Sequence, residues 1–97
     1  MSLRKLSIVQ ATDADVLVKV GSGIYGGVSL LGAAAGTFKV YDSSTVAGVS
    51  NAKLMDVGGV TAANASAHSS PCEPIKFTDG LVIVITGAGN LATIFYK

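Results

Sequence analysis

The sequence is poor in charged residues. Asp, Glu, Lys and Arg make up 13% of its 97 residues, roughly half the share of an ordinary soluble domain. Seven basic and six acidic residues leave a formal net charge of +1. This balance argues against nucleic acid or an anionic membrane as the main partner, because both require a basic surface. Because 49% of the residues are hydrophobic, we expect part of the surface to be covered in an oligomer or a larger assembly.

Cysteine and long apolar runs are also scarce. Cys72 is the one cysteine, which excludes an internal disulfide and a zinc site built from several thiolates. The apolar part of the N-terminal stretch "MSLRKLSIVQATDAD" is too short and too interrupted for a signal peptide. No run reaches the ~18 apolar residues of a membrane-spanning helix. The length predicts a single domain, residues 1–97, with a modest core.

Apolar and polar residues alternate with a period of two, which is typical of half-buried strands. The apolar members of this alternation are Val16, Val18 and Val20, then Phe38 and Val40, then Ile75 and Phe77, then Ile94 and Tyr96. The run "LVIVI" (81–85) is apolar on both faces and predicts a central strand that is covered on both sides. With Gly, Asp, Asn and Ser in the intervening turns, the pattern predicts an all-β fold, a compact antiparallel β-sandwich or barrel.

The C-terminal third predicts a meander. The turn signals "TDG" (78–80) and "GAGN" (87–90) flank "LVIVI", so strands 73–78, 81–86 and 90–96 are expected to pair in sequence order. Before them, the Ala/Ser-rich stretch "VTAANASAHSSPC" (60–72) has no charge and no clear period. We expect it to be a long loop with at most a short helical turn, of the kind that is often functional or forms an interface.

"VLVKVGSGIYGG" (16–27) contains the nucleotide-binding fingerprint G-x-G-x-x-G at Gly21, Gly23 and Gly26, and Asp42 stands where a ribose-binding carboxylate is expected. The following segment, 24–35, would have to be a helix, yet it has three glycines and no charged residue. A strand fits better, with Ile24, Val28 and Leu30 on one face and Tyr25, Ser29 and Leu31 on the other. We therefore interpret the glycines as turns and close backbone approaches, with no nucleotide site.

Other chemistry-bearing residues also lack the partners that a catalytic or metal site requires. His68 is followed by Cys72 and Glu73, but this spacing matches no nucleophilic pair, so we interpret His68 as a loop histidine beside a buried cysteine. Asp13 and Asp15 lack the further oxygen ligands of a calcium loop and are interpreted as turn residues.

The remaining candidates are two aspartates in turn motifs and three tyrosines. Asp42 opens "DSST", a type I or Asx turn, and Asp79–Gly80 is a hairpin signal. Tyr25, Tyr41 and Tyr96 have two interpretations: a sugar-binding surface, or positions at strand ends or in a subunit interface. The sequence predicts a non-enzymatic protein with no catalytic residues, no cofactor and no metal.

Two segments resemble a group of small phage virion proteins. They are "GIYGGVSLLGAAAGTFKVYDSS" and "PIKFTDGLVIVITGAGNLATIFYK". The matching positions are Gly36, Thr37, Val40, Tyr41, Asp42, Phe77, Gly80, Leu81, Val82, Gly87 and Tyr96. The resemblance implies a compact β-sandwich in capsid decoration (cement), head spike or fibre proteins, and it carries over no catalytic residue. The middle segment, 43–72, does not match and is expected to hold contacts specific to this protein.

The composition and the resemblance together predict a capsid decoration protein that stabilises the phage head by bridging capsid subunits. Its expected partner is the major capsid protein or another virion protein, and it is expected to form a homo-oligomer, with a trimer favoured. It would be located in the virion after assembly in the host cytoplasm. The alternative is a head-fibre, spike or tail-fibre module that binds a host-surface glycan, with Tyr25 or Tyr41 as the stacking platform.

Overall fold

The computed structural model describes residues 4–9, 14–31, 35–61, 66–69, 75–86 and 91–97. Within these ranges lie nine strands and one short 3₁₀ helix. They are β1 (Arg4–Val9), β2 (Ala14–Val20), β3 (Gly23–Leu31), β4 (Gly36–Tyr41), η1 (Asn51–Lys53), β5 (Leu54–Val60), β6 (Ser66–Ser69), β7 (Ile75–Phe77), β8 (Gly80–Ile85) and β9 (Leu91–Tyr96).

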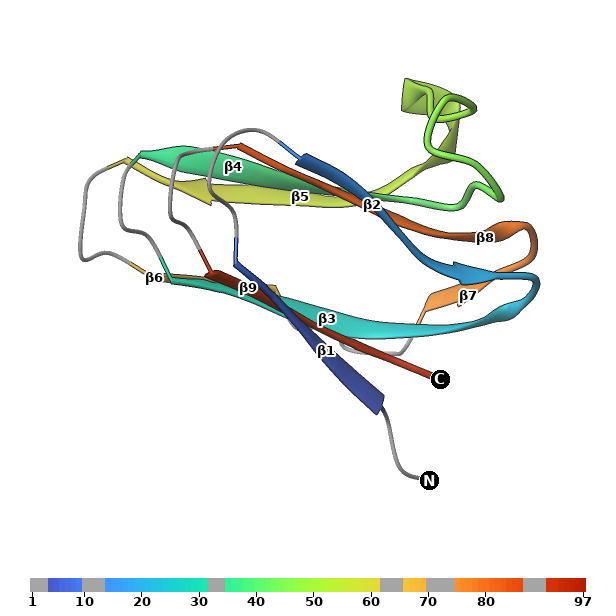
Figure 1. Ribbon diagram of the computed structural model, residues 1–97, viewed down its shortest axis with the longest axis horizontal. Helices are drawn as coiled ribbons and strands as arrows, with labels where there is room; N and C mark the ends of the chain where they lie inside the picture. The colour runs from blue at the N-terminus through green and yellow to red at the C-terminus, as the bar shows by residue number, and fades with distance from the viewer. Residues whose placement is uncertain (1–3, 10–13, 32–34, 62–65, 70–74, 87–90) are drawn as a thin grey trace.

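The strands form two antiparallel sheets that pack as two layers (Figure 1). The five-stranded sheet has the order β1-β9-β3-β6, and β7 pairs with β3 next to the β6 segment. The four-stranded sheet has the order β2-β8-β4-β5. The predicted all-β fold is thus confirmed, as two antiparallel sheets in a compact unit.

The hydrophobic core lies between the two sheets, and both sheets contribute to it. The buried members are Tyr25, Val28, Leu30, Phe77, Ala92 and Ile94 from the five-stranded sheet, and Phe38, Val40, Val60, Leu81, Ile83 and Ile85 from the four-stranded sheet. Each large apolar side chain removed from water stabilises the fold by roughly 1.5–3 kcal/mol. The alternation therefore correctly predicted the inward faces of β4, β7 and β9.

Strand β8 is buried on both faces, as its apolar run predicts. Leu81, Ile83 and Ile85 face the core. Val82 points the other way and is also fully buried, between its cross-strand neighbours Leu17 and Tyr41. Because β8 has no solvent-facing polar side chain, it takes an inner position in its sheet, between β2 and β4.

The predicted C-terminal meander is wrong in its pairing. β7 pairs with β3, β8 with β2 and β4, and β9 with β1 and β3, so consecutive strands alternate between the two sheets. Local turn signals fix where the chain reverses, but they do not fix which sheet the next strand joins. The three-residue β7 is too short to cover the six-residue β8, whereas β2 pairs with it along its whole length and β4 pairs with residues 82–85.

A bulge in β2 changes the face of its last residue. The register shifts between Leu17 and Lys19, so two residues of β2 oppose one residue of β8. Val16 and Val18 pack on the core as predicted, but Val20 is 66% exposed. The alternation of valines in the sequence predicted an inward Val20, because it gives no sign of the extra residue that reverses the faces after the bulge.

A second bulge lies in β3, between Tyr25 and Gly27. Gly27 has φ +132°, a backbone conformation that L side chains rarely adopt. The bulge places Tyr25 on the buried face together with Val28 and Leu30, whereas the sequence pattern placed Tyr25 on the opposite face. This prediction for Tyr25 is therefore corrected.

The Ala/Ser-rich stretch 60–72 is not one continuous loop. Val60 ends β5, and Ser66–Ser69 form β6, which pairs with residues 28–31 of β3. Residues 62–65 and 70–72 lie outside the described ranges. The strand escaped prediction because its inward residue at the core is the small Ala67, which gives no hydrophobic period.

Candidate functional site

The G-x-G-x-x-G glycines form a turn and the start of a strand. Gly21 lies in the β2–β3 turn with φ +91°, and its N–H donates to the Asp79 carbonyl at 2.9 Å. Gly23 opens β3, where a Cβ would collide with the Lys97 carbonyl and the Phe77 ring. Because residues 23–31 form a strand, the helix that a dinucleotide site needs is not there, and the interpretation as turn and close approach is confirmed.

Several of the other sequence candidates stand apart or lie outside the described residues. His68 is exposed on β6 and Asp15 is exposed on β2. Asp13, Cys72 and Glu73 lie outside the described ranges, as does Gly87 of the resembling segments. Among the residues that the structure does describe, no three His, Cys, Asp or Glu side chains gather as a metal site would require.

The tyrosines do not form a glycan platform. Tyr25 is 0% exposed and Tyr41 is 7% exposed, so neither ring can stack on a sugar. Tyr96 packs partly buried against the core. The prediction that Tyr25 or Tyr41 binds a glycan is therefore wrong, because both rings face other parts of the protein.

Tyr25 instead links the two sheets. Its hydroxyl donates to Asp56 Oδ2 on β5 at 2.7 Å, while Asp56 Oδ1 accepts the Val57 N–H at 2.8 Å. Burial, followed by the hydrogen bond and the charge of Asp56, raises the pKa of Tyr25 far above its ordinary value. The phenol therefore stays protonated and holds β3 to β5, which is a structural role.

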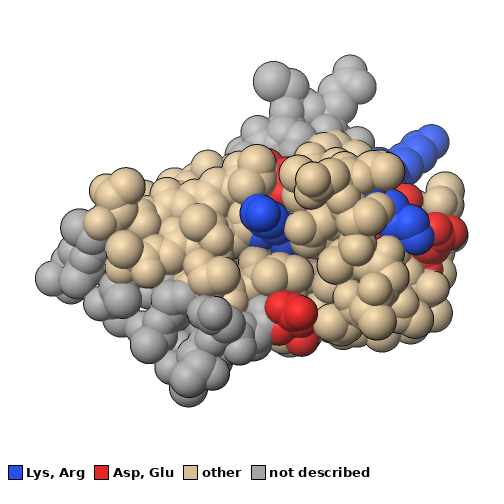
Figure 2. Space-filling model, turned by 90° about the horizontal axis from the view of Figure 1, so that it is seen from above, with Lys and Arg blue, Asp and Glu red and all other residues tan. Residues whose placement is uncertain are grey.

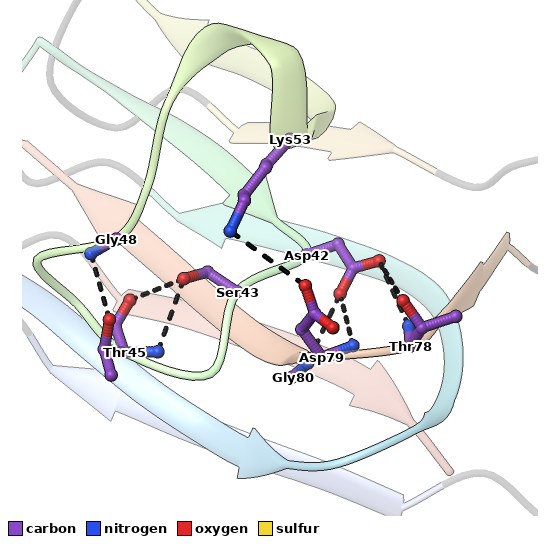
Figure 3. Close-up of polar contacts among 8 residues, drawn as sticks. All are labelled: Asp42, Ser43, Thr45, Gly48, Lys53, Thr78, Asp79 and Gly80. Carbon is purple, nitrogen blue, oxygen red and sulfur yellow. Dashed lines mark hydrogen bonds and ion pairs between the residues drawn. The ribbon is translucent and has the colours of Figure 1, made fainter.

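Asp42 lies at the centre of a cluster of polar contacts (Figure 3). Its Oδ1 accepts the backbone N–H groups of Asp79 at 2.9 Å and Gly80 at 3.3 Å, and its Oδ2 accepts the N–H of Thr78 at 3.1 Å and its hydroxyl at 3.4 Å. Partial burial raises the pKa of Asp42, but these donors outweigh it and leave the pKa below its ordinary value. We call this cluster the Asp42 clamp.

The clamp joins the end of β4 to the turn between β7 and β8. Gly80 is required there, because a Cβ would collide with the Ser43 carbonyl and would lie 2.8 Å from the Lys19 carbonyl. The turn predicted as a hairpin at Asp79–Gly80 instead connects the two sheets. The clamp thus fixes two segments that lie 36 to 38 residues apart in the sequence.

The chain that leaves the clamp, residues 43–53, forms a loop that stands out from the four-stranded sheet (Figure 1). Its base is closed by the Asp42 N–H, which donates to the Lys53 carbonyl at 2.9 Å. We call it the anchored loop. A compact loop with closed ends is a frequent site of function.

Hydrogen bonds within the anchored loop hold its first half. The buried Ser43 hydroxyl donates to the Thr45 carbonyl at 2.7 Å, and Gly48 donates its N–H to Thr45 Oγ1 at 3.0 Å (Figure 3). Lys53 lies 4.0 Å from Asp79 Oδ2, which adds a weak, solvent-screened ion pair beside the clamp. The loop is therefore presented in a set shape.

The anchored loop carries no charge between Ser44 and Ala52, and most of its side chains are small and exposed. It contains no His, Cys, Asp or Glu, the residues that most often act as general bases or metal ligands. Its chemistry suits contact with another surface, because a loop that is already ordered loses little conformational entropy on binding. The anchored loop is the candidate functional site.

Sequence reasoning identified the parts of this site but not their assembly. Asp42 was expected to form a local turn, yet its carboxylate binds backbone groups 36 to 38 residues later, and the local turn belongs to Ser43. The motifs "VYD" and "TDG" in the resembling segments are the two halves of the clamp. No local sequence pattern connects the two motifs. The one sequence signal of their contact was that both occur in the resembling segments.

The outer face of the four-stranded sheet adds apolar side chains to the exposed surface. Leu17 is 39% exposed and Val57 is 54% exposed. Figure 2 looks onto this side of the molecule: basic and acidic residues lie near the middle and toward one end, and the described surface at the other end is uncharged. Within the described part of the chain, no helix is long and apolar enough to span a membrane.

Comparisons with known proteins identify no family. No family model matches the chain, and no curated protein matches it. Among solved structures, the chain is similar to the crystal structure of PirA, with 17% sequence identity and a TM-score of 0.48, covering 100% of this chain and 94% of that one. A likeness at this level assigns neither a family nor a function.

Proposed function

We propose that this protein is a non-enzymatic structural component of a phage virion, a capsid decoration protein that bridges neighbouring capsid subunits. The observation that carries the proposal is the anchored loop: the Asp42 clamp presents an uncharged, exposed segment in a set shape. The polar groups best placed for chemistry, Asp42 and the Tyr25–Asp56 pair, are engaged in holding the framework.

The resemblance to small virion proteins supports the same function. Its matching positions include Asp42 and Gly80, which build the clamp, while the segment that departs from the resemblance contains the anchored loop. A common frame with a variable contact loop suits a protein that binds a different capsid in each phage. Modest contacts repeated on a symmetric shell add up through avidity.

The proposed partner is the major capsid protein or another virion protein, and the proposed active form is a homo-oligomer, with a trimer favoured. The exposed side chains of Leu17, Val20, Leu31 and Val57 supply apolar area that such contacts would bury. Light scattering on the purified protein tests this form, and a mass of three chains supports it. A monomer in solution that also yields no cross-linked trimer on particles contradicts it.

The particle assay tests the function itself. Phage particles purified from the strain that carries the gene are analysed by mass spectrometry, and this protein is expected among their components. Ala47→Glu, in the anchored loop, should reduce its copy number on particles, because it places a charge in the proposed contact. Ala35→Glu is the matched control, at an exposed position outside the loop. Absence of the wild-type protein from the particles would overturn the proposal.

A further inference from the structure

The net charge of +1 conceals an uneven distribution of charge between the two sheets. The five-stranded sheet and the residue after β9 carry Arg4, Lys5, Lys76 and Lys97, and no Asp or Glu among their described residues. The four-stranded sheet with its turns carries both signs: Asp15, Lys19, Lys39, Asp42, Lys53, Asp56 and Asp79.

Two of the basic residues flank one apolar side chain on the outer face of the five-stranded sheet. Lys76 on β7 is the cross-strand partner of Ile24. On the other side of Ile24, Lys97 exchanges two backbone hydrogen bonds with it, both at 2.8 Å. Because Tyr25 is fully buried, its neighbour Ile24 faces outward, and cross-strand partners share that face. We call Lys76, Ile24 and Lys97 the Ile24 row.

The next row of the same face adds a second apolar side chain. Phe95 is half-buried, and its backbone pairs with Lys5 of β1 on one side and with Gly27 of β3 on the other. Lys76 and Lys97 are both exposed, and they lie two strand spacings apart, about 10 Å. The surface therefore combines separated cations with apolar side chains between them.

Protection of a sheet edge explains only part of this arrangement. Lysine on a short edge strand such as β7 discourages pairing with other chains. Lys97 follows β9, which lies inside the sheet between β1 and β3, where no edge needs protection. The lysine positions thus share a face of the sheet rather than an edge.

We infer that the Ile24 row docks onto an acidic surface of a protein partner. This inference rests on the proposed function and specifies which side of the molecule meets the particle. Charge complementarity gives the sign of the partner surface, since the described residues of this sheet include no Asp or Glu side chain that would oppose the lysines. A protein is favoured over nucleic acid because Ile24 and Phe95 lie among the cations, whereas phosphate backbones are bound by denser basic surfaces.

A matched pair of charge reversals tests the inference. Lys76→Glu and Lys39→Glu each change the net charge by the same amount, and both lysines are exposed in strands of opposite sheets. The probe is immobilised poly-L-glutamate at low ionic strength. Lys76→Glu should weaken binding about fivefold, and Lys39→Glu by less than about twofold. Both variants should keep their thermal unfolding midpoint within about 3 °C of wild type.

Equal losses for the two variants would overturn the inference, because binding would then follow net charge alone. Stronger wild-type binding to duplex DNA or to phosphatidylserine vesicles than to poly-L-glutamate would also overturn it. On particles, zero-length carbodiimide cross-linking should join the Lys76 or Lys97 amine to a carboxylate of another virion protein. Failure of the particle assay with a retained difference between the two variants would reject the proposed function and leave the surface assignment standing.

Discussion

The two sheets of this protein differ in how they use their outer faces. In the four-stranded sheet, β8 is buried on both sides, and Val82 on its outer face is as inaccessible as the core. In the five-stranded sheet, the inner strand β9 follows alternation, with Ala92 and Ile94 buried and Leu91, Thr93 and Phe95 only partly so. The four-stranded sheet therefore buries residues on both faces of β8, whereas the five-stranded sheet has an outer face whose exposed charged residues in the described ranges, Lys76 and Lys97, are basic.

The residues explain this difference. "GLVIVI" has no polar position, so its strand must be covered on both faces, and the clamp and the anchored loop lie at one end of it. "LATIFY" alternates, so one of its faces tolerates water. The comparison therefore predicts that substitutions near β8 cost more stability than similar ones on the outer face of the five-stranded sheet.

The largest effect is expected at Gly80, where the four-stranded sheet meets the anchored loop. Gly80→Ala forces a Cβ against the carbonyls of Ser43 and Lys19, so backbone segments must separate. We expect a loss of about 3–4 kcal/mol in the free energy of unfolding, measured by urea titration. Gly21→Ala is the control: its Cβ meets open space, and the positive φ alone should cost about 1–2 kcal/mol. Equal losses would contradict the close approach.

The next largest effect is expected from a pair of substitutions, one on the outer face of each sheet. Val82→Ala should cost about 2 kcal/mol, because it removes buried methyl groups and leaves a void behind β8. Leu31→Ala, on the outer face of the five-stranded sheet and 54% exposed, should cost less than about 1 kcal/mol although it removes more atoms. Chemical denaturation of both variants measures the difference, and the reverse order would refute the comparison.

The Asp42 clamp gives a smaller, pH-dependent effect. Asp42→Asn replaces one acceptor oxygen by a donor, and at neutral pH it should cost about 1.5 kcal/mol. Because the pKa of Asp42 is lower in the folded chain than in the unfolded one, its contribution is fully present above the unfolded pKa. That contribution is lost as the pH falls through the folded pKa.

Wild type and Asp42→Asn should therefore approach the same stability as the solution is acidified. Thermal unfolding recorded from pH 7 to pH 2 checks the sign. A gap between the two proteins that stays constant, or widens in acid, would show that the clamp does not depend on the charge of Asp42.

The smallest effect is expected at the link between the two sheets. Tyr25→Phe keeps the buried ring and removes the hydroxyl that donates to Asp56, so it should cost about 1 kcal/mol. A double-mutant cycle with Asp56→Asn measures the coupling between the two side chains. A coupling energy near zero would mean that the hydrogen bond does not hold the sheets together.

The sequence predicted the strands better than their partners. The alternation correctly placed Phe38, Val40 and Ile94 on the inside, and the apolar run of β8 correctly predicted its coverage. The faces of Val20 and Tyr25 were mispredicted because one extra residue in a bulge reverses a period of two. Pairing between distant strands leaves no local signal, so the C-terminal meander was wrong.

The candidate site was even less accessible to sequence reasoning. Asp42 and Gly80 were singled out, but as two separate turns, because the contact between them spans 38 residues. The anchored loop itself is a run of small uncharged residues with no motif. What makes it a distinct surface is the closure of its base, which depends on the folded arrangement of β4, β5 and β8.

The position of β9 also determines when the five-stranded sheet can form during synthesis. Strand β9 lies between β1 and β3, so neither of these early strands gains that neighbour until residues 91–96 have emerged from the ribosome. Sheets built from such distant pairs fold slowly, and their unpaired strands are exposed to aggregation meanwhile. The five-stranded sheet therefore cannot close until residues 91–96 have been made, and β1 and β3 lack this shared neighbour up to that point.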